Sequence, residues 1–330
     1  MARKEETVMK FSLIIPFFNA EQWIGRCLDS CLHQDIPQDD YELILIDDGS
    51  SDNSSSIAEG KLLGKDNVTI LHQENKGQGA ARNKGLCAAK GELVWFIDSD
   101  DRIEENCLGS IAGLIEDADI LAISAADERE GRSIRRFGWK SSWGVSGKEL
   151  VRSTKINVGT PFSIYRRALI EKNGLRFIEN IFHEDAEFTP RAYFFADKVI
   201  CTDCIFYYVY PSPGSTTRSS NPKRVFDSIE TAQRSLSDFV QCIEQPYRTG
   251  FDNLLSSDMT HALKDASTFD KATRHRISEC VYHNRDLFRH MKKSDLAKFR
   301  FEGLIFSTFP KHTVGIMKAF LAVQRLCCGK

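Results

Sequence analysis

Val94-Trp95-Phe96-Ile97-Asp98-Ser99-Asp100-Asp101 is an apolar run that ends abruptly in three carboxylates. A buried strand cannot solvate charge, so acids placed where it emerges need a reason. In an open parallel sheet, ligands bind at the carboxyl ends of the strands. Carboxylates two residues apart on an extended chain point to the same side, and hard divalent cations prefer such oxygen ligands. The segment alone fits two interpretations equally: a metal site, or a cap in which Asp98 or Asp100 begins a helix over 104–115.

The composition limits the class of protein. A chain of 330 residues that is 42% hydrophobic can bury a full core and hold one large domain with an appendage. Its 44 Lys and Arg against 46 Asp and Glu give a formal net charge of -2, so no basic field indicates nucleic acid. The polar first ten residues predict no signal peptide, and no apolar run reaches the length of a membrane span. Ten cysteines without secretory context predict reduced thiols and a cytoplasmic protein.

Strands and helices are expected to alternate through the first part of the chain. Apolar β-rich runs predict strands at 11–17, 41–46, 68–72, 93–97 and 120–124, and helical spacing predicts helices at 20–32, 53–63, 80–89 and 104–115. This alternation predicts βαβ units and a mostly parallel sheet. Later segments are expected to be a charged excursion at 129–143, an extended segment at 157–164, a helix at 184–196, a long strand at 198–210, and helices beyond about 222.

Four motifs occur in one order. One strand ends in Pro16-Phe17-Phe18-Asn19-Ala20 and another in Asp47-Asp48-Gly49-Ser50-Ser51-Asp52, and the Gly-rich segment 75–85 precedes the acidic cluster at 98–101. Over roughly residues 11–218 this pattern resembles the large inverting family-2 glycosyltransferases of the GT-A fold. The resemblance implies an α/β fold, a GT-A (Rossmann-like) mostly parallel sheet flanked by helices, with a C-terminal helical extension.

The resemblance also implies a domain organisation. A glycosyltransferase domain is expected at 9–218, with its nucleotide-sugar half at about 9–125 and its acceptor half at about 126–218. A helical C-terminal region is expected at 219–330.

The strand tips are the expected donor site. Phe18 offers a ring for stacking on a base, and the resemblance places Asp48 on the imide N–H of a uracil-type base; the alternative for Asp48 is a turn before Gly49. Gly77 and its neighbour Gly79 permit close backbone approach. Arg82 can reach a diphosphate with its planar guanidinium, or pair with one of the tip aspartates. The expected donor-binding set is Pro16, Phe18, Asn19, Asp48, Gly77, Arg82, Asp98, Ser99 and Arg218.

The resemblance implies a divalent cation, Mn²⁺ or Mg²⁺, at the acidic cluster. Asp100 is expected on the metal that bridges the diphosphate, and Asp98 against the ribose or on the metal through water. Charge grows on a diphosphate leaving group as the sugar bond breaks, so a cation there stabilises the transition state. Asp101 is expected to cap a helix or support the other two acids. Arg218 belongs to a Ser/Thr-rich segment that is either a lid over the diphosphate or an ordinary loop.

Phe182-His183-Glu184-Asp185 marks the expected acceptor side. The resemblance places the general base at Asp185, where a carboxylate can take the proton of the acceptor hydroxyl as it attacks C1 opposite the diphosphate. Such direct displacement inverts the anomeric centre. From the residues alone, a simple preference for acids at a helix N-terminus is the favoured interpretation of Glu184 and Asp185. His183 is a further candidate for the acceptor site.

The predicted function is the addition of a single hexosyl or N-acetylhexosaminyl group from a nucleotide-diphosphate sugar, UDP-linked, to a carbohydrate or lipid-linked saccharide in surface polysaccharide or glycoconjugate biosynthesis. The Gln-x-x-Arg-Trp sequence of processive synthases is missing. The alternatives are an Asp-x-Asp phosphohydrolase or phosphotransferase, in which Thr or Val soon after the second Asp is expected where this chain has Asp101-Arg102, and an inactive nucleotide-sugar-binding module.

The apolar segment 314–326, bracketed by basic residues, raises the question of peripheral membrane contact. It could lie in a membrane interface on the cytoplasmic face, or it could dock on the body of the protein. Its sparsely basic polar face favours docking.

Overall fold

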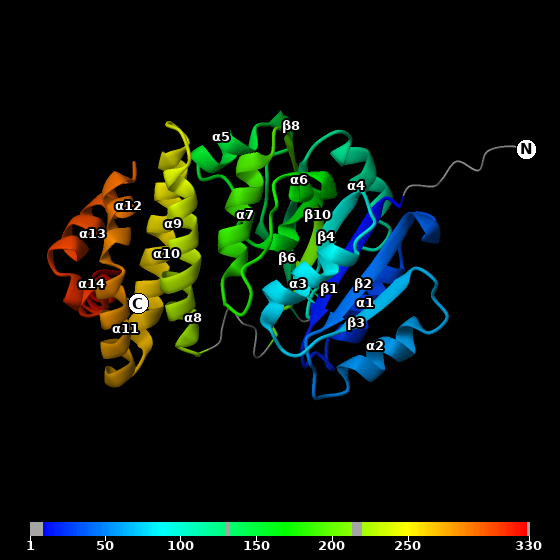
Figure 1. Cartoon of the computed structure of the whole chain (residues 1–330), viewed down its shortest axis with the longest axis horizontal. Helices are drawn as coiled ribbons and strands as arrows, with labels where there is room; N and C mark the ends of the chain where they lie inside the picture. The colour runs from blue at the N-terminus through cyan, green and yellow to red at the C-terminus, as the bar shows by residue number, and fades with distance from the viewer. Residues whose placement is uncertain (1–8, 130–131, 213–219, 329–330) are drawn as a thin grey trace, which may run out of the picture. The chain divides into compact units, whose positions relative to one another are not determined.

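The computed structural model describes residues 9–129, 132–212 and 220–328, and the chain divides into two compact units (Figure 1). The sheet unit comprises residues 1–148, 157–180 and 191–218. The helical unit comprises residues 149–156, 181–190 and 219–330. Within the described ranges, no helix combines the length and the apolar character needed to cross a membrane.

The sheet unit is built on a ten-stranded sheet with the order β3-β2-β1-β4-β9-β6-β10-β5, to which β7 adds on β6 and β8 on β10. Pairing is parallel across β3, β2, β1 and β4 and between β6 and β10, and antiparallel at the other contacts. The strands are β1 (Phe11–Phe17), β2 (Tyr41–Asp47), β3 (Val68–His72), β4 (Leu93–Phe96), β5 (Arg102–Ile103), β6 (Ile120–Arg129), β7 (Arg132–Phe137), β8 (Ser142–Val145), β9 (Ser163–Arg166) and β10 (Val199–Val209).

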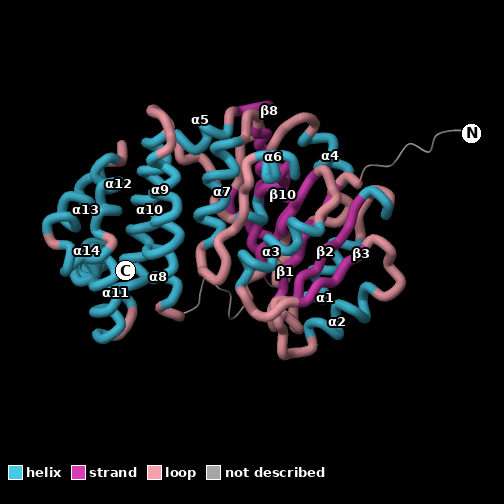
Figure 2. Tube along the Cα trace, in the orientation of Figure 1, coloured by secondary structure: helices cyan, strands magenta, loops and turns pink. Residues whose placement is uncertain are grey.

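Helices cover both faces of the parallel part of this sheet (Figure 2). Every residue of β1 and β2 is buried, as expected for strands covered on both sides. Odd-numbered residues such as Leu13 pack in a core cluster with α1, α2 and α4. On the other face, Gly85 of α3 lies so close to the sheet that a Cβ there would come within 2.4 Å of Ile14 and 2.9 Å of Ile46. The α/β prediction is therefore confirmed.

The helices that precede residue 200 are α1 (Ile24–Leu32), α2 (Ser54–Leu62), α3 (Gly77–Ala88), α4 (Leu108–Ile115), α5 (Gly147–Arg152), α6 (Arg167–Lys172) and α7 (Glu184–Phe195), with short 3-10 turns η1 (Gln38–Asp40) and η2 (Thr160–Phe162).

The helical unit is organised around the 21-residue helix α10. Helices α9, α12 and α14 pack against it, and one apolar cluster that includes Met259, Leu263 and Phe306 forms the core. The elements are α8 (Lys223–Asp227), the π-helix η4 (Ser228–Ala232), α9 (Gln233–Gln241), α10 (Arg248–Thr268), α11 (Lys271–His283), η5 (Arg285–Leu287), α12 (Phe288–Lys293), α13 (Ala297–Thr308), η6 (Pro310–His312) and α14 (Thr313–Cys328). The expected C-terminal helices are confirmed.

Among the expected elements whose bounds differ in the structure, three change the description of the sheet or the site. The helix expected over 104–115 begins only at Leu108, because Arg102 and Ile103 form the short strand β5 on β10. The helix expected over 80–89 begins at Gly77, so the Gly-rich segment lies in its first turn. The charged excursion at 129–143 contains β7 and β8, whose pairing partners lie on β6 and β10 and leave no local signal in the segment itself.

Candidate functional site

The strand register brings three acidic or aromatic loops to one edge of the sheet. Phe17 of β1 pairs with Asp47 of β2, and Ile14 pairs with Phe96 of β4, so the carboxyl ends of the three strands are neighbours. The expected donor residues Pro16 and Phe18 differ sharply in accessibility: Pro16 is buried within β1, whereas Phe18 is 47% exposed. Of this pair, only the Phe18 ring is available to a ligand.

Asn19 ties the turn after β1 to the turn after β2. Its backbone has a positive φ of 48°, which Asn tolerates better than most residues. The Asn19 Oδ1 accepts the backbone N–H of Ser51 at 2.8 Å, and the Asn19 N–H donates to Ser50 Oγ at 3.1 Å. Asn19 therefore fixes the rim of the site.

Asp48 holds the beginning of helix α3. Its Oδ1 accepts from Gln73 Nε2 and from the backbone N–H of Lys76, both at 2.8 Å, and its Oδ2 accepts from the backbone N–H of Gly77 at 2.9 Å. The two backbone N–H groups, those of Lys76 and Gly77, are of the kind that a helix leaves without an internal partner at its start. The Asp48 Oδ2 atom can accept a further hydrogen bond, so the prediction that Asp48 also binds a base stays open.

Gly77 and Gly79 serve the fold in the first turn of α3. Gly77 has a φ of +83°, a conformation that favours glycine. A Cβ on Gly79 would lie 2.3 Å from the carbonyl oxygen of Ile178. A close backbone approach is expected at these glycines. At Gly79 the backbone that comes close is that of Ile178.

Gly79→Ala is expected to destabilise the protein by about 1–3 kcal/mol, because the contact is with backbone that cannot rotate away. Gly60→Ala in α2 is the matched control: nothing lies within 4 Å of the point that its Cβ would occupy, and alanine is expected to stabilise that helix by about 0.5–1 kcal/mol. Chemical denaturation of both variants measures the difference. Equal stability of the two variants would contradict this account of α3.

Arg82 pairs with the acidic cluster. Its side chain is buried, its Nη2 donates to Asp98 Oδ1 at 2.9 Å, and its guanidinium lies 5.4 Å from the centre of the Phe177 ring. Of the two interpretations of Arg82, pairing with a tip aspartate is thus the one seen in the structure. The bond also orients the Asp98 carboxylate, and the predicted contact of Arg82 with a diphosphate stays a prediction.

Asp100 and Asp101 are tied to the end of β10. Asp100 Oδ2 accepts from Ser212 Oγ at 2.6 Å, and Asp101 Oδ1 accepts from the backbone N–H of Tyr210 at 2.8 Å. Burial raises the pKa of the Asp100 carboxyl, and the charge of Asp98 raises it further. Burial and the two neighbouring acids raise the pKa of Asp101 well above its usual range. Asp101 caps no helix, since α4 begins at Leu108.

The chemistry of this cluster fits a divalent cation. The crowding of Asp98 and Asp100, which raises the pKa of Asp100, is the kind of repulsion that a cation relieves. In the described part of the chain, no three His, Cys, Asp or Glu side chains are arranged to hold a metal by themselves. Mg²⁺ and similar ions are usually held by one or two carboxylates together with phosphate oxygens and water. Two carboxylates beside a diphosphate would therefore suffice.

Asp185 lies in the helical unit, in the first turn of α7. It is half-buried, and its Oδ1 accepts the backbone N–H of Ala186 at 2.8 Å. The flanking Glu184 and Glu187 are buried, and Glu187 Oε1 accepts from Ser235 Oγ at 2.8 Å. Asp185 is thus the most accessible acid of this turn. Arg218 and the segment 215–218 lie outside the described residues.

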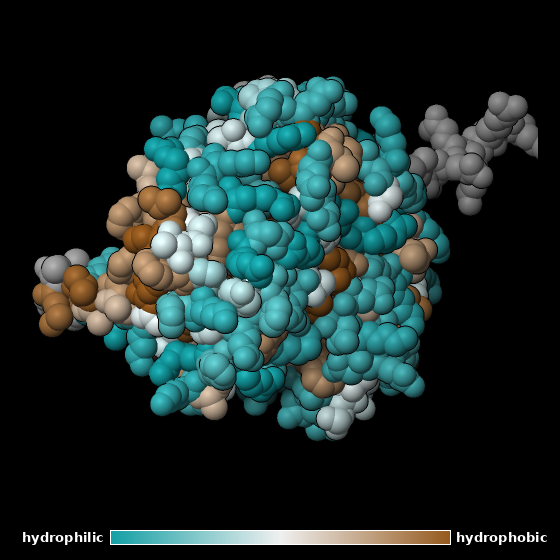
Figure 3. All heavy atoms as spheres, turned by 60° about the vertical axis from the view of Figure 1, so that its left-hand side comes forward, coloured by the Kyte–Doolittle hydropathy of each residue, from teal (hydrophilic) through white to brown (hydrophobic). Residues whose placement is uncertain are grey.

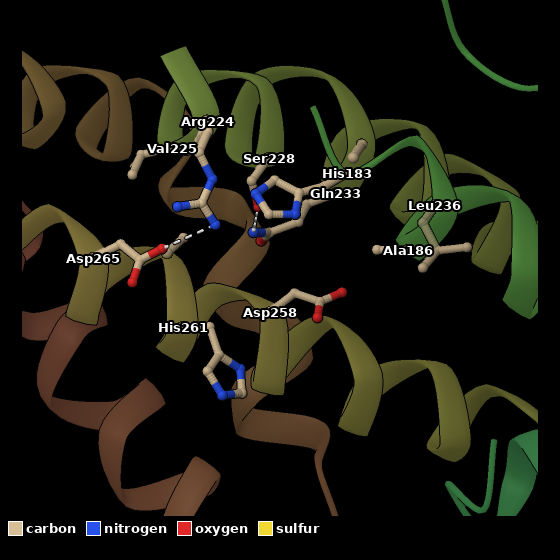
Figure 4. Close-up of a pocket in the computed structure, with 12 residues that line it drawn as sticks. His183, Ala186, Arg224, Val225, Ser228, Gln233, Leu236, Asp258, His261 and Asp265 are labelled. Carbon is tan, nitrogen blue, oxygen red and sulfur yellow. Dashed lines mark hydrogen bonds and ion pairs between the residues drawn. The ribbon is translucent and has the colours of Figure 1, made fainter. Parts of the chain in front are cut away.

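A cavity of about 60 Å³ in the helical unit lies beside this turn (Figure 4). That volume has room for several water molecules. On one side Arg224 pairs with Asp265 at 3.7 Å. Gln233 donates to Ser228 Oγ at 3.0 Å, while its buried Oε1 accepts no hydrogen bond from the described residues. The lining residues are His183, Ala186, Arg224, Val225, Ser228, Ala232, Gln233, Leu236, Asp258, His261, Ala262 and Asp265.

Two titratable groups in this cavity are perturbed. Burial, with a further contribution from the charge of Asp185, raises the pKa of Asp258 to about 7. Burial and the nearby Arg224 lower the pKa of His183, which has a positive φ of 67° at the start of α7. The expected acceptor residue His183 therefore lines a polar cavity together with Asp258, whose pKa is raised in part by the charge of Asp185.

Comparison with known proteins identifies the family to which this chain belongs. The profile described as "Glycosyl transferase family 2" matches residues 12–174, a range that includes β1, the Asp48 turn, α3 and the acidic cluster. The chain belongs to glycosyltransferase family 2.

Two curated relatives of this family-2 chain are named as glycosyltransferases of poly(ribitol phosphate). Poly(ribitol-phosphate) beta-N-acetylglucosaminyltransferase TarS of Staphylococcus aureus is 31% identical over 274 residues, which cover 81% of this chain and 44% of TarS. Poly(ribitol-phosphate) beta-glucosyltransferase of Bacillus spizizenii is 31% identical over 211 residues, which cover 62% of this chain and 33% of that protein. The chain thus spans less than half the length of both relatives.

A solved structure supports the fold assignment. The crystal structure of S. aureus TarS 1–349 in complex with UDP-GlcNAc matches with a TM-score of 0.75 at 22% sequence identity. The match covers 98% of this chain and 93% of that one. The GT-A prediction for this family-2 chain is therefore confirmed.

Several residues around the acidic cluster are not evident from the sequence. Arg26 Nη2 donates to the backbone carbonyl of Asp100 at 2.6 Å, and its guanidinium lies 4.3 Å from the centre of the Tyr210 ring. Tyr207 Oη accepts the backbone N–H of Asp98 at 3.1 Å. These contacts join residues 74 and 109 positions apart. The aromatic run at the end of β10 is the one signal in the sequence, and it does not show which strand tip it meets.

Asp258→Asn is expected to stabilise the protein in a pH-dependent way. A carboxyl whose pKa rises on folding costs stability as the pH increases from about 4 to about 7. The variant lacks this cost, so its gain should be near zero at pH 4 and about 2–4 kcal/mol at pH 8. Thermal unfolding at several pH values measures it, with the exposed Asp66→Asn as control. A gain that is the same at every pH would show that Asp258 titrates normally.

Proposed function

We propose that this chain transfers a hexosyl or N-acetylhexosaminyl group from a UDP-sugar to a hydroxyl group of a surface polymer or glycoconjugate, with inversion and with help from a divalent cation. The acidic cluster at the tip of β4 carries the proposal, since it lies at the edge where sheets of this class bind nucleotides. The names of the two relatives and the UDP-GlcNAc bound to TarS support the donor and the kind of acceptor.

In the proposed donor site, Asp98 and Asp100 would hold Mn²⁺ or Mg²⁺. When bound, the cation supplies positive charge against the diphosphate leaving group. The exposed Phe18 ring would stack on the base, and Asp48, already bonded to the first turn of α3, would accept the imide N–H. Arg82 would add positive charge beside Asp98. The remaining proposed donor-binding residues are Asn19, Gly77, Ser99 and Arg218, whereas the buried Pro16 supports the strand that presents Phe18.

In the proposed acceptor step, Asp185 takes the proton of the acceptor hydroxyl. The hydroxyl oxygen then forms a bond to C1 of the sugar, while the electron pair of the C1–oxygen bond to the diphosphate leaves with UDP. Because attack and departure occur on opposite faces, the anomeric configuration inverts. Asp185 lies close enough to Asp258 for its charge to contribute to the raised pKa of Asp258.

A donor panel tests the proposed function. The chain is incubated with Mn²⁺, poly(ribitol phosphate), and UDP-GlcNAc, UDP-glucose, UDP-galactose or GDP-mannose in turn, and released nucleotide is measured with and without acceptor. Acceptor-dependent release of UDP is expected from at least one UDP-sugar. Release of inorganic phosphate from a phosphomonoester, with no release of UDP, would favour the phosphohydrolase alternative. Binding of UDP without any turnover would favour the inactive module.

The cellular location is part of the proposal. The cysteines whose side chains the structure describes are free thiols, which fits the reducing cytoplasm, where a peripheral position on the membrane would bring the enzyme to lipid-linked acceptors.

A further inference from the structure

The large apolar side chains that remain exposed are concentrated in the last helices. Ten such side chains are exposed in the described parts of the chain, and seven of them lie between positions 296 and 326. In Figure 3 the apolar residues gather over α13 and α14 on the face of the helical unit that is turned forward. The seven residues are Leu296, Phe301, Leu304, Phe309, Phe320, Val323 and Leu326.

Helix α14 is apolar on both of its sides. Val314 and Met317 are buried in the core of the helical unit. The opposite side of the helix, at a spacing of three and four residues, is exposed and carries no polar group. Its residues are Gly315, Ala319, Ala322, Val323 and Leu326. Packing in the helical unit therefore buries one side of α14 and leaves a second apolar side exposed. From the sequence, docking and membrane contact are alternatives, but the two sides of α14 are compatible with both.

The longer stretch from residue 292 to residue 326, which includes α13 and most of α14, has an excess of basic residues. Between residues 292 and 326 there are seven Lys and Arg, all exposed, and two acids. One of the acids, Glu302, is buried and accepts from Thr260 Oγ1 at 2.8 Å, which leaves Asp295 as the single exposed acid of the segment. This excess contrasts with the formal charge of -2 for the whole chain. The exposed basic residues are Lys292, Lys293, Lys298, Arg300, Lys311, Lys318 and Arg325.

We propose that the exposed faces of α13 and α14 bind the interface of a lipid bilayer that contains anionic lipids. Exposed apolar patches on a soluble fold mark interaction sites. An interfacial helix combines a buried apolar face with Lys and Arg that reach anionic headgroups. Lys318 and Arg325 of α14 lie along one border of the apolar side that Val323 and Leu326 help to form. A second copy of the chain is a poor partner, because two surfaces of the same positive sign repel each other.

The contact would hold the helical unit at a membrane surface without a spanning segment. The inference depends only on α13 and α14 and stands whether or not the chain transfers a sugar. If both hold, the enzyme works where lipid-anchored acceptors are concentrated.

Co-sedimentation of the full chain with vesicles tests the inference. Vesicles of phosphatidylcholine with about 30 mol % phosphatidylglycerol are compared with vesicles of phosphatidylcholine alone. Binding should be about tenfold or more tighter to the anionic vesicles, and it should weaken as salt rises from about 0.05 to 0.5 M.

Two double variants separate the apolar and the electrostatic contributions. Val323→Ser with Leu326→Ser removes side chains that are 57% and 84% exposed, so the fold should tolerate it, yet vesicle binding should fall about tenfold or more. Lys318→Glu with Arg325→Glu should reduce binding to anionic vesicles to a similar degree. The matched controls lie in the sheet unit: Leu63→Ser, at an 86% exposed position, and Lys65→Glu with Lys90→Glu, which changes the net charge equally.

Three results would overturn the inference. The first is the absence of vesicle binding at low salt. The second is an equal loss of binding in the matched controls. The third is a chain that is dimeric by light scattering and becomes monomeric with Val323→Ser and Leu326→Ser while its vesicle binding stays unchanged, which would make this face a protein interface.

Discussion

Asp185→Asn is expected to lower sugar transfer by about 10²–10⁴-fold while leaving UDP binding unchanged, the range in which a general base contributes. The amide keeps the size of the side chain and can still accept the Ala186 N–H through its oxygen, but it cannot take the acceptor proton. Initial rates of UDP release at saturating donor and acceptor measure the loss, and calorimetric titration of UDP measures binding.

Asp270→Asn is the matched control for Asp185→Asn. Asp270 caps α11 by accepting the backbone N–H groups of Ala272 and Thr273, so it is an acid at a helix N-terminus in the same unit, and Asn is an equally good cap. It should leave transfer unchanged. If Asp185 served only its helix, the two variants would behave alike: each would lose at most about 1 kcal/mol of stability and keep full activity.

Asp100→Ala is expected to abolish the dependence of transfer on Mn²⁺ and to reduce the rate by about 10²–10³-fold, similar to other losses of transition-state charge stabilisation. The fold should tolerate the change, because burial and Asp98 already disfavour the charged Asp100 carboxylate. Rates measured across a Mn²⁺ titration test the prediction.

Ser212→Ala is the control for Asp100→Ala, since it removes the hydroxyl that donates to Asp100 Oδ2 and leaves the carboxylate in place. It should reduce the rate by tenfold at most and keep the Mn²⁺ dependence, given that a neutral hydrogen bond contributes about 1 kcal/mol. A Mn²⁺ response in Asp100→Ala equal to that of the unchanged chain would remove Asp100 from the metal site.

The sequence predicts best those elements whose residues all share one environment, such as a strand that is buried along its whole length. Strand β1 has the bounds expected from the sequence, Phe11–Phe17, because every one of its residues is buried, and the chain reaches solvent at Phe18 directly after it. The start of α3 is less evident: a Gly-rich segment resembles a loop, and the carboxylate that stabilises its first turn comes from Asp48, 29 positions before Gly77. Strand β5 is equally hidden, since its pairing with Tyr207 and Tyr208 depends on tertiary contacts.

In the candidate site, too, the sequence indicates local features and does not show contacts that depend on the tertiary fold. The sequence indicates which acids lie at the tip of β4, and it offers pairing between Arg82 and a tip aspartate as an alternative, which the structure bears out with Asp98. It does not indicate Arg26, Ser212 or Tyr210, because the contacts of α1 and the end of β10 with the cluster depend on sheet order. Hydrogen bonds between residues more than 70 positions apart leave no periodic signal.

The most direct test of the central claim is calorimetric titration of the chain with UDP in the presence and absence of Mn²⁺, with ADP as the comparison nucleotide. The account predicts that Mn²⁺ tightens UDP binding by about tenfold or more, since the cation would join Asp98 and Asp100 to the diphosphate. It also predicts that ADP binds more weakly than UDP under both conditions. Equal UDP affinity with and without Mn²⁺, or equal binding of ADP and UDP, would contradict it.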